Sequence, residues 1–174
     1  SSRAADYGRL KDYAPFSFPT EETGGIIGNG DITMDWIVQV LKRTVDTQYR
    51  TKADRRHTFL AGSSMGGLMT LYGLLAYPEV FSRGAALSPS LWIDAEKVKA
   101  MIRHARVKRN TVLYMDYGAL EFADHPHSRS LFAEVSALLI EKRVLLNSRI
   151  VPRGTHCEAS WEKQIPFFMK TLFE

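Results

Sequence analysis

Short apolar runs alternate with longer amphipathic segments along most of the chain, and this alternation strongly limits the folds that it can adopt. Four runs have the length and composition of buried strands: His57–Ala61, Gly84–Ser88, Thr111–Asp116 and Leu146–Val151. Strands that alternate with helices of roughly 10–15 residues are typical of a parallel sheet covered by helices on both faces. The predicted fold class is therefore α/β, with a mostly parallel sheet.

The segments around these runs have helical periodicity. Asp31 is expected to cap the first helix, which runs to about Thr47 and carries its apolar residues on one inward face. That face comprises Trp36, Ile37, Val40, Leu41 and Val45. The other predicted helices are Met65–Tyr77, Asp94–Ala105 with Asp94 as its cap, Ser128–Lys142 and Glu158–Leu172. Pro166 either kinks the last helix or begins a second piece.

The length of 174 residues fits a single domain. Prolines and glycines punctuate residues 1–30, which lack an apolar period, so we expect an irregular segment there and an α/β domain over residues 31–174. No apolar run reaches the roughly 18 residues of a membrane span, which predicts no membrane association. Cys157 is the single cysteine, a composition that favours a reducing, cytoplasmic location.

The net charge of +4 comes partly from two basic clusters. They are Arg50, Lys52, Arg55 and Arg56, and then Arg103, Arg106, Lys108 and Arg109. Each cluster falls between a helix-like and a strand-like stretch, where a solvated connection is the usual explanation. No aromatic-rich basic face or binding motif accompanies the charge, so no nucleic-acid partner is expected.

The segment Gly62–Gly66 reads Gly-Ser-Ser-Met-Gly and matches the G-x-S-x-G pattern of a nucleophile elbow. An apolar strand precedes it and a helix follows it, which is the context that this motif requires. The tight turn admits only small residues two positions on either side of the serine. Ser64 has glycines at both positions, unlike its neighbour Ser63, and is the predicted nucleophile. The amide of Met65 is expected to face a developing oxyanion.

A nucleophilic serine needs a base, and in this kind of fold the histidine comes last in the chain. His156 lies just past the final predicted strand, at the edge where open α/β sheets place their sites. His57 opens the elbow strand at its far end, His104 lies within a helix, and His125 and His127 occupy a loop. His156 is therefore the predicted base.

The acid that orients the histidine should follow the strand Thr111–Asp116. Three carboxylates do so: Asp116, Glu121 and Asp124. Asp116 is expected to remain at the strand end, and Asp124 is a candidate cap for the next helix. The turn at Gly118 allows the chain to present Glu121, which is favoured over the other two.

Two rival chemistries have weaker support. Cys157 beside His156 is a conceivable thiol nucleophile, but neighbours in sequence rarely face one another after a strand, and no elbow surrounds this cysteine. His125 and His127 flank Pro126, a spacing that favours a loop over a preformed ligand face. Neither a metal nor another cofactor is expected.

Four sequence blocks in order resemble the esterase family of the α/β-hydrolase superfamily, which includes enterochelin-type siderophore esterases, feruloyl esterases and mycolyltransferase relatives. The blocks are Gly62–Gly67, Leu87–Trp92, Gly118–Glu121 and Gly154–His156, with Trp161 five residues beyond the last. The resemblance covers nearly the whole chain from about Tyr13. Its closest match is a bacterial branch of predicted α/β hydrolases.

This resemblance implies an α/β-hydrolase-like fold and a serine carboxylic-ester hydrolase. It implies Ser64 as the nucleophile, His156 as the base and Glu121, at the G-x-x-E position, as the acid. It also suggests that Trp92 and Trp161 lie near the acyl or alcohol pocket, although a core role is equally compatible with each. The expected substrate is a small or siderophore- or feruloyl-type ester.

The chain departs from the family pattern before the elbow. Family members carry several strands ahead of the elbow helix, and one of the preceding loops supplies a second oxyanion-hole amide. Only one helix and about 30 irregular residues precede the elbow strand in this sequence. We therefore expect a fold that is incomplete at the N-terminus, and an exposed sheet edge that favours self-association.

The predicted function is ester hydrolysis through an acyl-enzyme at Ser64. Two alternatives stay open. The same residues can pass the acyl group to an acceptor other than water, as in an acyltransferase. A non-catalytic interaction protein can also retain the hydrolase fold. The short N-terminal part slightly favours that interpretation, whereas the intact Ser64 and His156 count against it.

Overall fold

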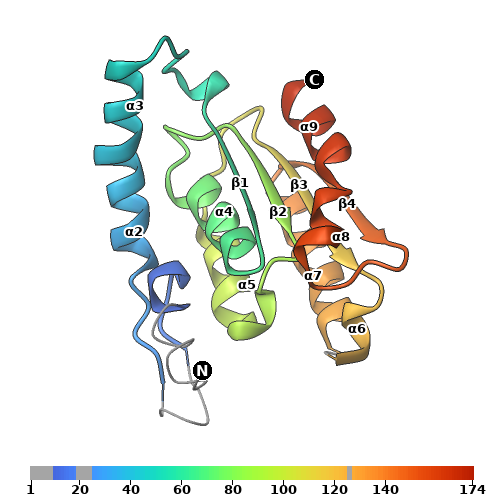
Figure 1. Cartoon of the computed structure of the whole chain (residues 1–174). Coiled ribbons are helices and arrows are strands. Elements are labelled where there is room, and N and C mark those ends of the chain that lie inside the picture. Colours follow the sequence, from blue (N-terminus) through green and yellow to red (C-terminus); the bar gives the residue numbers. More distant parts are fainter. Residues whose placement is uncertain (1–9, 19–24, 125–126) are drawn as a thin grey trace.

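A computed structural model describes residues 10–18, 25–124 and 127–174, and a four-stranded sheet lies at its centre (Figure 1). The strand order follows the sequence, and each pair of neighbours is parallel. The strands are β1 (Phe59–Ser63), β2 (Arg83–Leu87), β3 (Val112–Gly118) and β4 (Leu145–Val151). The predicted α/β class with a parallel sheet is confirmed.

The first strand begins two residues later than predicted. Asp54 caps the short 3-10 helix η3 (Arg55–His57), because its carboxylate accepts a hydrogen bond from the Arg56 amide. His57 Nδ1 also lies 2.8 Å from Asp54 Oδ2. This local turn holds His57 out of the strand, so the prediction that His57 opens the elbow strand is wrong.

Helices cover both faces of the sheet. Alternate side chains of β3 point to opposite sides. Leu113 and Met115 lie in the larger core with α4 (Met65–Ala76), whereas Tyr114 packs with Leu172 on the other face. The larger core also includes buried residues of α5 (Ala95–His104) and α7 (Ser128–Glu141). The remaining elements between β2 and the C-terminus are η4 (Leu91–Ile93), α6 (Glu121–Asp124), α8 (Glu158–Glu162) and α9 (Ile165–Phe173).

The C-terminal helical segment consists of two pieces, and Pro166 lies in the first turn of the second. A proline is tolerated there because the first-turn amides of a helix have no intrahelical acceptor. Of the two predicted alternatives, a kink or a new helix, the structure has the new helix α9, whose residues pack on β2 and β3.

A long helix precedes the sheet and comprises α2 (Gly30–Trp36), the π-helical turn η2 (Ile37–Leu41) and α3 (Lys42–Gln48). It begins after Asn29, so Asp31 lies in its first turn and is not the cap. The predicted inward face is wrong for four of its five residues, and only Ile37 is half-buried and packs on the core. Met34 and Val38 are the buried apolar residues, whereas Trp36, Val40, Leu41 and Val45 are all exposed over more than a third of their surface.

The contacts of this helix explain the difference. Its first part, α2, packs on α4 and on η1 (Lys11–Tyr13), while α3 extends beyond these elements (Figure 1). The apolar period therefore marked residues that can be buried. The first part of the helix packs on other helices, whereas α3 contacts the following loop through hydrogen bonds of Lys42 with Ala53 O and of Asp46 with Thr51. Among residues 10–18, 25–124 and 127–174, no helix is long and apolar enough to cross a membrane.

The outer edge of β1 pairs with no other strand in the part of the chain that the structure describes. Between this strand and the long helix is a hollow of about 370 Å³, lined on one side by Ile37, Leu41 and Val45 and on the other by Phe59 and Leu60. Unpaired strand edges can pair with another chain. Self-association through this edge stays a prediction.

The turn from β1 to α4 depends on one glycine. A Cβ on Gly62 would lie 2.5 Å from the backbone carbonyl of Gly66, which is closer than packed atoms allow. A Cβ on Gly66 would meet no neighbouring atom within 4 Å. The expectation that crowding requires a small residue on both sides of Ser64 therefore holds for Gly62 but not for Gly66.

We predict that Gly62→Ala lowers the free energy of unfolding by about 1–3 kcal/mol, because backbone atoms must move to admit the methyl group. Gly66→Ala is the matched control, and we expect it to be neutral or stabilising by up to about 1 kcal/mol, since alanine favours helix. Urea unfolding of both variants checks this. Equal destabilisation by the two substitutions would contradict the packing argument.

Candidate active site

The carboxyl ends of the four parallel strands meet at one edge of the sheet and carry the candidate residues. Ser64 follows β1, Ser88 follows β2, Glu121 follows the end of β3, and His156 lies in the loop after β4. Open α/β sheets bind ligands at this edge. Strand direction therefore brings residues that are far apart in sequence to the same edge.

Ser64 occupies a strained turn between β1 and α4, with φ at +56°. Few non-glycine residues adopt such a conformation, so it marks a constrained position. Two backbone hydrogen bonds hold the turn: the Ser64 amide donates to Leu87 O at 2.9 Å, and Ser64 O accepts from the Ser90 amide at 3.1 Å. The turn thus projects the Ser64 hydroxyl away from the sheet edge.

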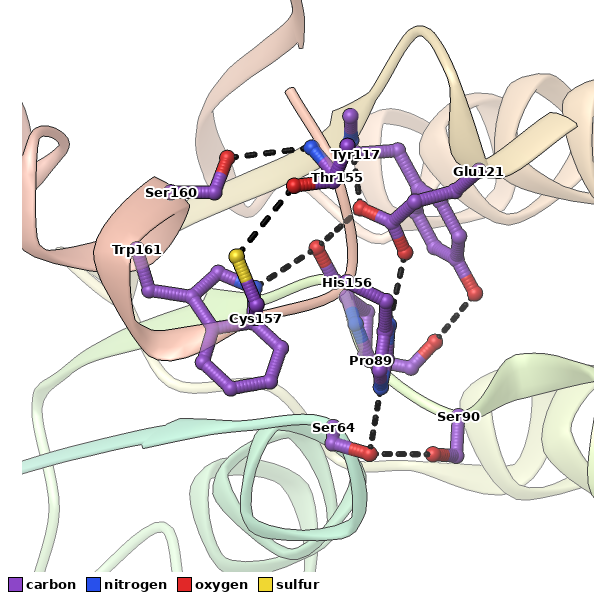
Figure 2. Close-up of polar contacts among 12 residues, drawn as sticks. Ser64, Pro89, Ser90, Tyr117, Glu121, Thr155, His156, Cys157, Ser160 and Trp161 are labelled. Carbon is purple, nitrogen blue, oxygen red and sulfur yellow. Dashed lines mark hydrogen bonds and ion pairs between the residues drawn. The ribbon is translucent and has the colours of Figure 1, made fainter.

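A hydrogen-bonded chain joins three side chains (Figure 2). Ser64 Oγ lies 2.8 Å from His156 Nε2, and His156 Nδ1 lies 2.7 Å from Glu121 Oε2. A carboxylate can only accept, so Nδ1 carries the imidazole proton, which leaves Nε2 free to accept from the serine hydroxyl. The chain has the order and polarity of a serine–histidine–acid triad.

The Glu121 carboxylate is almost fully enclosed, with 4% of its side chain exposed. Oε1 accepts hydrogen bonds from the Ser88 hydroxyl at 2.7 Å and from the Gly118 amide at 2.8 Å. Burial alone would raise the pKa of this carboxyl, but the hydrogen bonds from His156, Ser88 and Gly118 outweigh burial and lower the pKa below its ordinary value. Glu121 is therefore held ionised beside the imidazole.

The rival acid Asp116 is also buried, but it contacts other groups. Its Oδ2 accepts from the Tyr114 hydroxyl at 2.8 Å, and its Oδ1 lies 3.1 Å from the Ser88 amide. Burial raises the pKa of Asp116, and the nearby charge of Glu121 adds to this effect. It lies within β3 rather than after it. The side chain of Asp124, the third candidate, is outside the part that the structure describes.

Two glycines allow the acid and the histidine to meet. A Cβ on Gly118 would collide with the Gly154 backbone, and one on Gly154 would lie 2.7 Å from the Gly118 Cα. The two segments are also hydrogen-bonded: the Ala119 amide donates to Val151 O at 2.9 Å, and the Leu120 amide donates to Gly154 O at 3.0 Å. The loop that carries His156 is therefore packed directly on the turn that carries Glu121.

Met65 is the first residue of α4, so the helix itself provides no acceptor for its amide. The N-terminus of this 12-residue helix carries partial positive charge close to the Ser64 hydroxyl. Ser90, a buried residue after β2, places its own hydroxyl 3.4 Å from Ser64 Oγ. This arrangement suits the accumulation of negative charge next to Ser64.

The two predicted pocket tryptophans have different surroundings. Trp92 lies in η4 and is 49% exposed. Trp161 lies in α8, and its ring meets the His156 ring edge to face, with the centroids 5.0 Å apart (Figure 2). The Trp161 indole N–H donates to Ser88 Oγ at 3.0 Å. A pocket role for either residue stays a prediction.

Sequence reasoning missed Ser88 and Ser90 as members of this cluster. Both belong to the block Leu87–Trp92, and Ser88 was the last residue of a predicted strand. Because the carboxyl ends of all strands share one edge, a serine at the end of that predicted strand was a detectable signal.

Cys157, the rival nucleophile, has its hydrogen bond with Thr155, since the two side-chain atoms Sγ and Oγ1 lie 3.2 Å apart (Figure 2). This contact, with backbone amides of α8, lowers the pKa of the thiol. Within residues 10–18, 25–124 and 127–174, no group of three His, Cys, Asp or Glu side chains is arranged to hold a metal ion. Of the two histidines that the sequence disfavoured as a ligand pair, His125 lies outside these ranges, together with Pro126.

Residues 11–169 match the model of a protein family described as Putative esterase. The chain belongs to this esterase family. The match covers the elbow, the acid position and the histidine loop. No curated protein matches the chain significantly in sequence.

Solved structures share the fold of this esterase-family chain. The IroE-like serine hydrolase from Shewanella oneidensis aligns with a TM-score of 0.74 and 20% identity over 94% of this chain and 55% of its own. The siderophore hydrolase EstA from Aspergillus nidulans aligns with a TM-score of 0.69 and 19% identity, over 95% of this chain and 67% of its own. The enterochelin esterase from Shigella flexneri aligns with a TM-score of 0.67 and 22% identity, over 82% of this chain and 37% of its own. The chain thus spans 37% to 67% of the length of these proteins.

The two buried carboxyls predict opposite effects of pH on stability. The folded pKa of Glu121 is below its ordinary value of 4.5, so the carboxylate stabilises the fold above about pH 4.5, and this contribution is lost as the pH falls through the folded pKa. Glu121→Gln should therefore be less stable than wild type near neutral pH, with the gap narrowing toward about pH 3.

Asp116→Asn is the control for this prediction. The folded pKa of Asp116 is above its ordinary value of 3.8, so its ionisation opposes folding as the pH rises. The stability of Asp116→Asn relative to wild type should improve toward neutral pH. Denaturant unfolding between about pH 3 and 7 measures how the stability of each variant relative to wild type changes with pH. A change of the same sign in Glu121→Gln and Asp116→Asn would contradict the opposite pKa shifts of the two carboxyls.

Proposed function

We propose that the protein is a serine carboxylic-ester hydrolase that works through an acyl-enzyme at Ser64. The observation that carries the proposal is the continuous hydrogen-bonded chain from Ser64 through His156 to the buried carboxylate of Glu121. Membership of the esterase family supports it independently.

The reaction follows from the polarity of this chain. Ser64 Oγ attacks the ester carbonyl carbon while its proton passes to His156 Nε2, and the imidazolium is stabilised by Glu121. The Met65 amide donates to the oxyanion of the tetrahedral intermediate. The bond to the alcohol oxygen then breaks, and His156 returns the proton to the leaving alcohol.

A water molecule completes the cycle. It attacks the acyl carbon as His156 Nε2 takes one of its protons, and the bond to Ser64 Oγ breaks as the serine recovers a proton from the imidazole. The side chains already named account for every proton transfer of this cycle, and the Met65 amide is its oxyanion donor.

The substrate class proposed is an ester of the siderophore or feruloyl type, including small synthetic esters as test substrates. Several structural neighbours have names that refer to ferulic acid, enterobactin or siderophores. Trp92 lies in η4, two residues after Ser90, and Trp161 lies in α8 with its ring against His156. Both tryptophans are proposed to contact the acyl or alcohol part of the ester.

Hydrolysis of p-nitrophenyl acetate tests the proposal. We expect turnover by the wild-type chain and a loss of about 10⁴-fold or more in Ser64→Ala, with labelling by a fluorophosphonate probe lost as well. Glu121→Gln should lose activity on the order of 10²- to 10⁴-fold, because a neutral amide does not stabilise the imidazolium.

The adjacent Ser63→Ala and the thiol variant Cys157→Ala are the matched controls, and both should keep the probe labelling of wild type. Labelling that persists in Ser64→Ala and disappears in Cys157→Ala would assign the role of nucleophile to the Cys157 thiol instead of Ser64. Wild-type chain that neither hydrolyses the ester nor takes up the probe would favour the non-catalytic alternative.

A further inference from the structure

Ser88 has an unusual place behind the hydrogen-bonded chain. It follows β2 directly, is 1% exposed, and has φ at +41°, a conformation that serine rarely adopts. Its amide donates to Asp116 O at 3.0 Å and lies 3.1 Å from Asp116 Oδ1. The backbone of β3 therefore holds Ser88 in a strained turn that aims its hydroxyl at the site.

The hydroxyl of Ser88 has two hydrogen-bond partners. Trp161 Nε1 lies 3.0 Å away and Glu121 Oε1 lies 2.7 Å away. An indole nitrogen can only donate and a carboxylate can only accept. The Ser88 hydroxyl must therefore accept from Trp161 and donate its own hydrogen to Glu121. These two hydrogen bonds form a relay from Trp161 through Ser88 to Glu121, and its two end groups fix its direction.

Trp161 also touches the other member of the acid–histidine pair. Its ring packs against the His156 ring at an interplanar angle of 84°. Its N–H donates to Ser88 Oγ. One side chain thus restrains the imidazole by contact and the carboxylate through a hydroxyl. Both restraints act on the hydrogen bond between His156 Nδ1 and Glu121 Oε2.

We propose that Ser88 is a positioning residue, and that the relay from Trp161 through Ser88 holds the Glu121 carboxylate in line with His156. Neither residue takes part in bond making. This inference rests on the proposed ester hydrolysis, in which Glu121 orients the imidazole and stabilises its charged form.

Removing the hydroxyl has two consequences for the carboxylate. Oε1 keeps only the Gly118 amide, so the carboxylate loses one of its three hydrogen-bond donors, the third being His156 Nδ1 at Oε2. The Ser88 hydrogen bond also helps to lower the pKa of Glu121, so the pKa should rise without it. The indole N–H of Trp161 is at the same time left without its acceptor.

The kinetic test compares Ser88→Ala, Trp161→Phe and the double variant. Ser88→Ala should lower kcat by about 10- to 100-fold, the usual effect of losing a residue that orients a catalytic group. KM should change little, because the buried hydroxyl does not face the substrate. Trp161→Phe keeps a ring against His156 but removes the N–H. Because Trp161 is also proposed to contact the substrate, the comparison is made on kcat alone, and kcat of the double variant should be no lower than that of Ser88→Ala.

Ser82→Ala is the matched control. Ser82 is a buried serine just before β2, at the opposite end of the strand from Ser88, and its hydroxyl has no hydrogen-bond partner within the described chain. The same deletion of an oxygen atom from a buried serine should leave kcat unchanged. A fall in kcat equal to that of Ser88→Ala would assign the effect to packing and overturn the proposal.

A second readout does not depend on turnover. The ¹⁵N shifts of the His156 ring report which nitrogen carries the proton. In wild type and Ser82→Ala they should indicate the Nδ1–H form, and Ser88→Ala should shift the balance toward Nε2–H. Unchanged ring shifts in Ser88→Ala, or a rise in KM with kcat unchanged, would overturn the positioning role.

The two proposals can fail separately. Ser64→Ala should lose turnover while the His156 ring keeps its wild-type tautomer, because Glu121 and Ser88 are intact. If wild type hydrolyses no ester, the proposed function fails, whereas the tautomer measurement in Ser88→Ala still decides whether the relay positions Glu121.

Discussion

The contact between the backbones at Gly118 and Gly154 sets the separation of the two loops from which Glu121 and His156 extend. Any side chain at either position would push these loops apart. The Ala119 and Leu120 amides reinforce the contact with hydrogen bonds to the chain between Val151 and Gly154. Because a displacement of about 1 Å would break a hydrogen bond of 2.7 Å, the candidate site depends on this approach before it depends on any side chain.

A buried carboxylate imposes the next constraint. Removing the charge of Glu121 from water is unfavourable unless every lone pair that faces protein finds a donor. The donors come from three places: the Gly118 amide at the end of β3, the Ser88 hydroxyl at the end of β2, and the imidazole in the loop after β4. The strain at Ser88 is consistent with this requirement, since its backbone is fixed by β3 so that its hydroxyl can reach the acid.

Much of this arrangement could be predicted from the sequence, because strand direction carries so much of the information. Alternating strands and helices predict parallel strands, and parallel strands bring Ser64, Glu121 and His156 to one edge. The choice of Glu121 over Asp116 followed from the turn at Gly118. The role of Ser88 depends on a positive φ and on the arrival of Trp161 from a distant helix, and neither is encoded in a local pattern.

The errors have a related physical origin. The apolar period of the long helix was correct as a pattern, but burial depends on what lies opposite, and Trp36 and Val40 are exposed while Met34 and Val38 pack. β1 begins later than predicted because Asp54 caps the turn Arg55–His57 through hydrogen bonds that the apolar strand pattern does not reveal. Periodicity therefore predicts which face can be covered, and tertiary contacts decide which one is.

Because all four strands are parallel, the two ends of the sheet differ in chemistry. The amino ends carry a hollow lined by Lys52, Arg56, His57 and Arg83. Three of these groups are already engaged, Arg83 with Leu172 O at the C-terminus of α9, and His57 and Arg56 with Asp54. The carboxyl ends carry the elbow, both buried carboxylates and the imidazole. Since the polar groups of the proposed reaction all lie at the carboxyl ends, substitutions at the amino ends should change stability without changing the chemistry at Ser64.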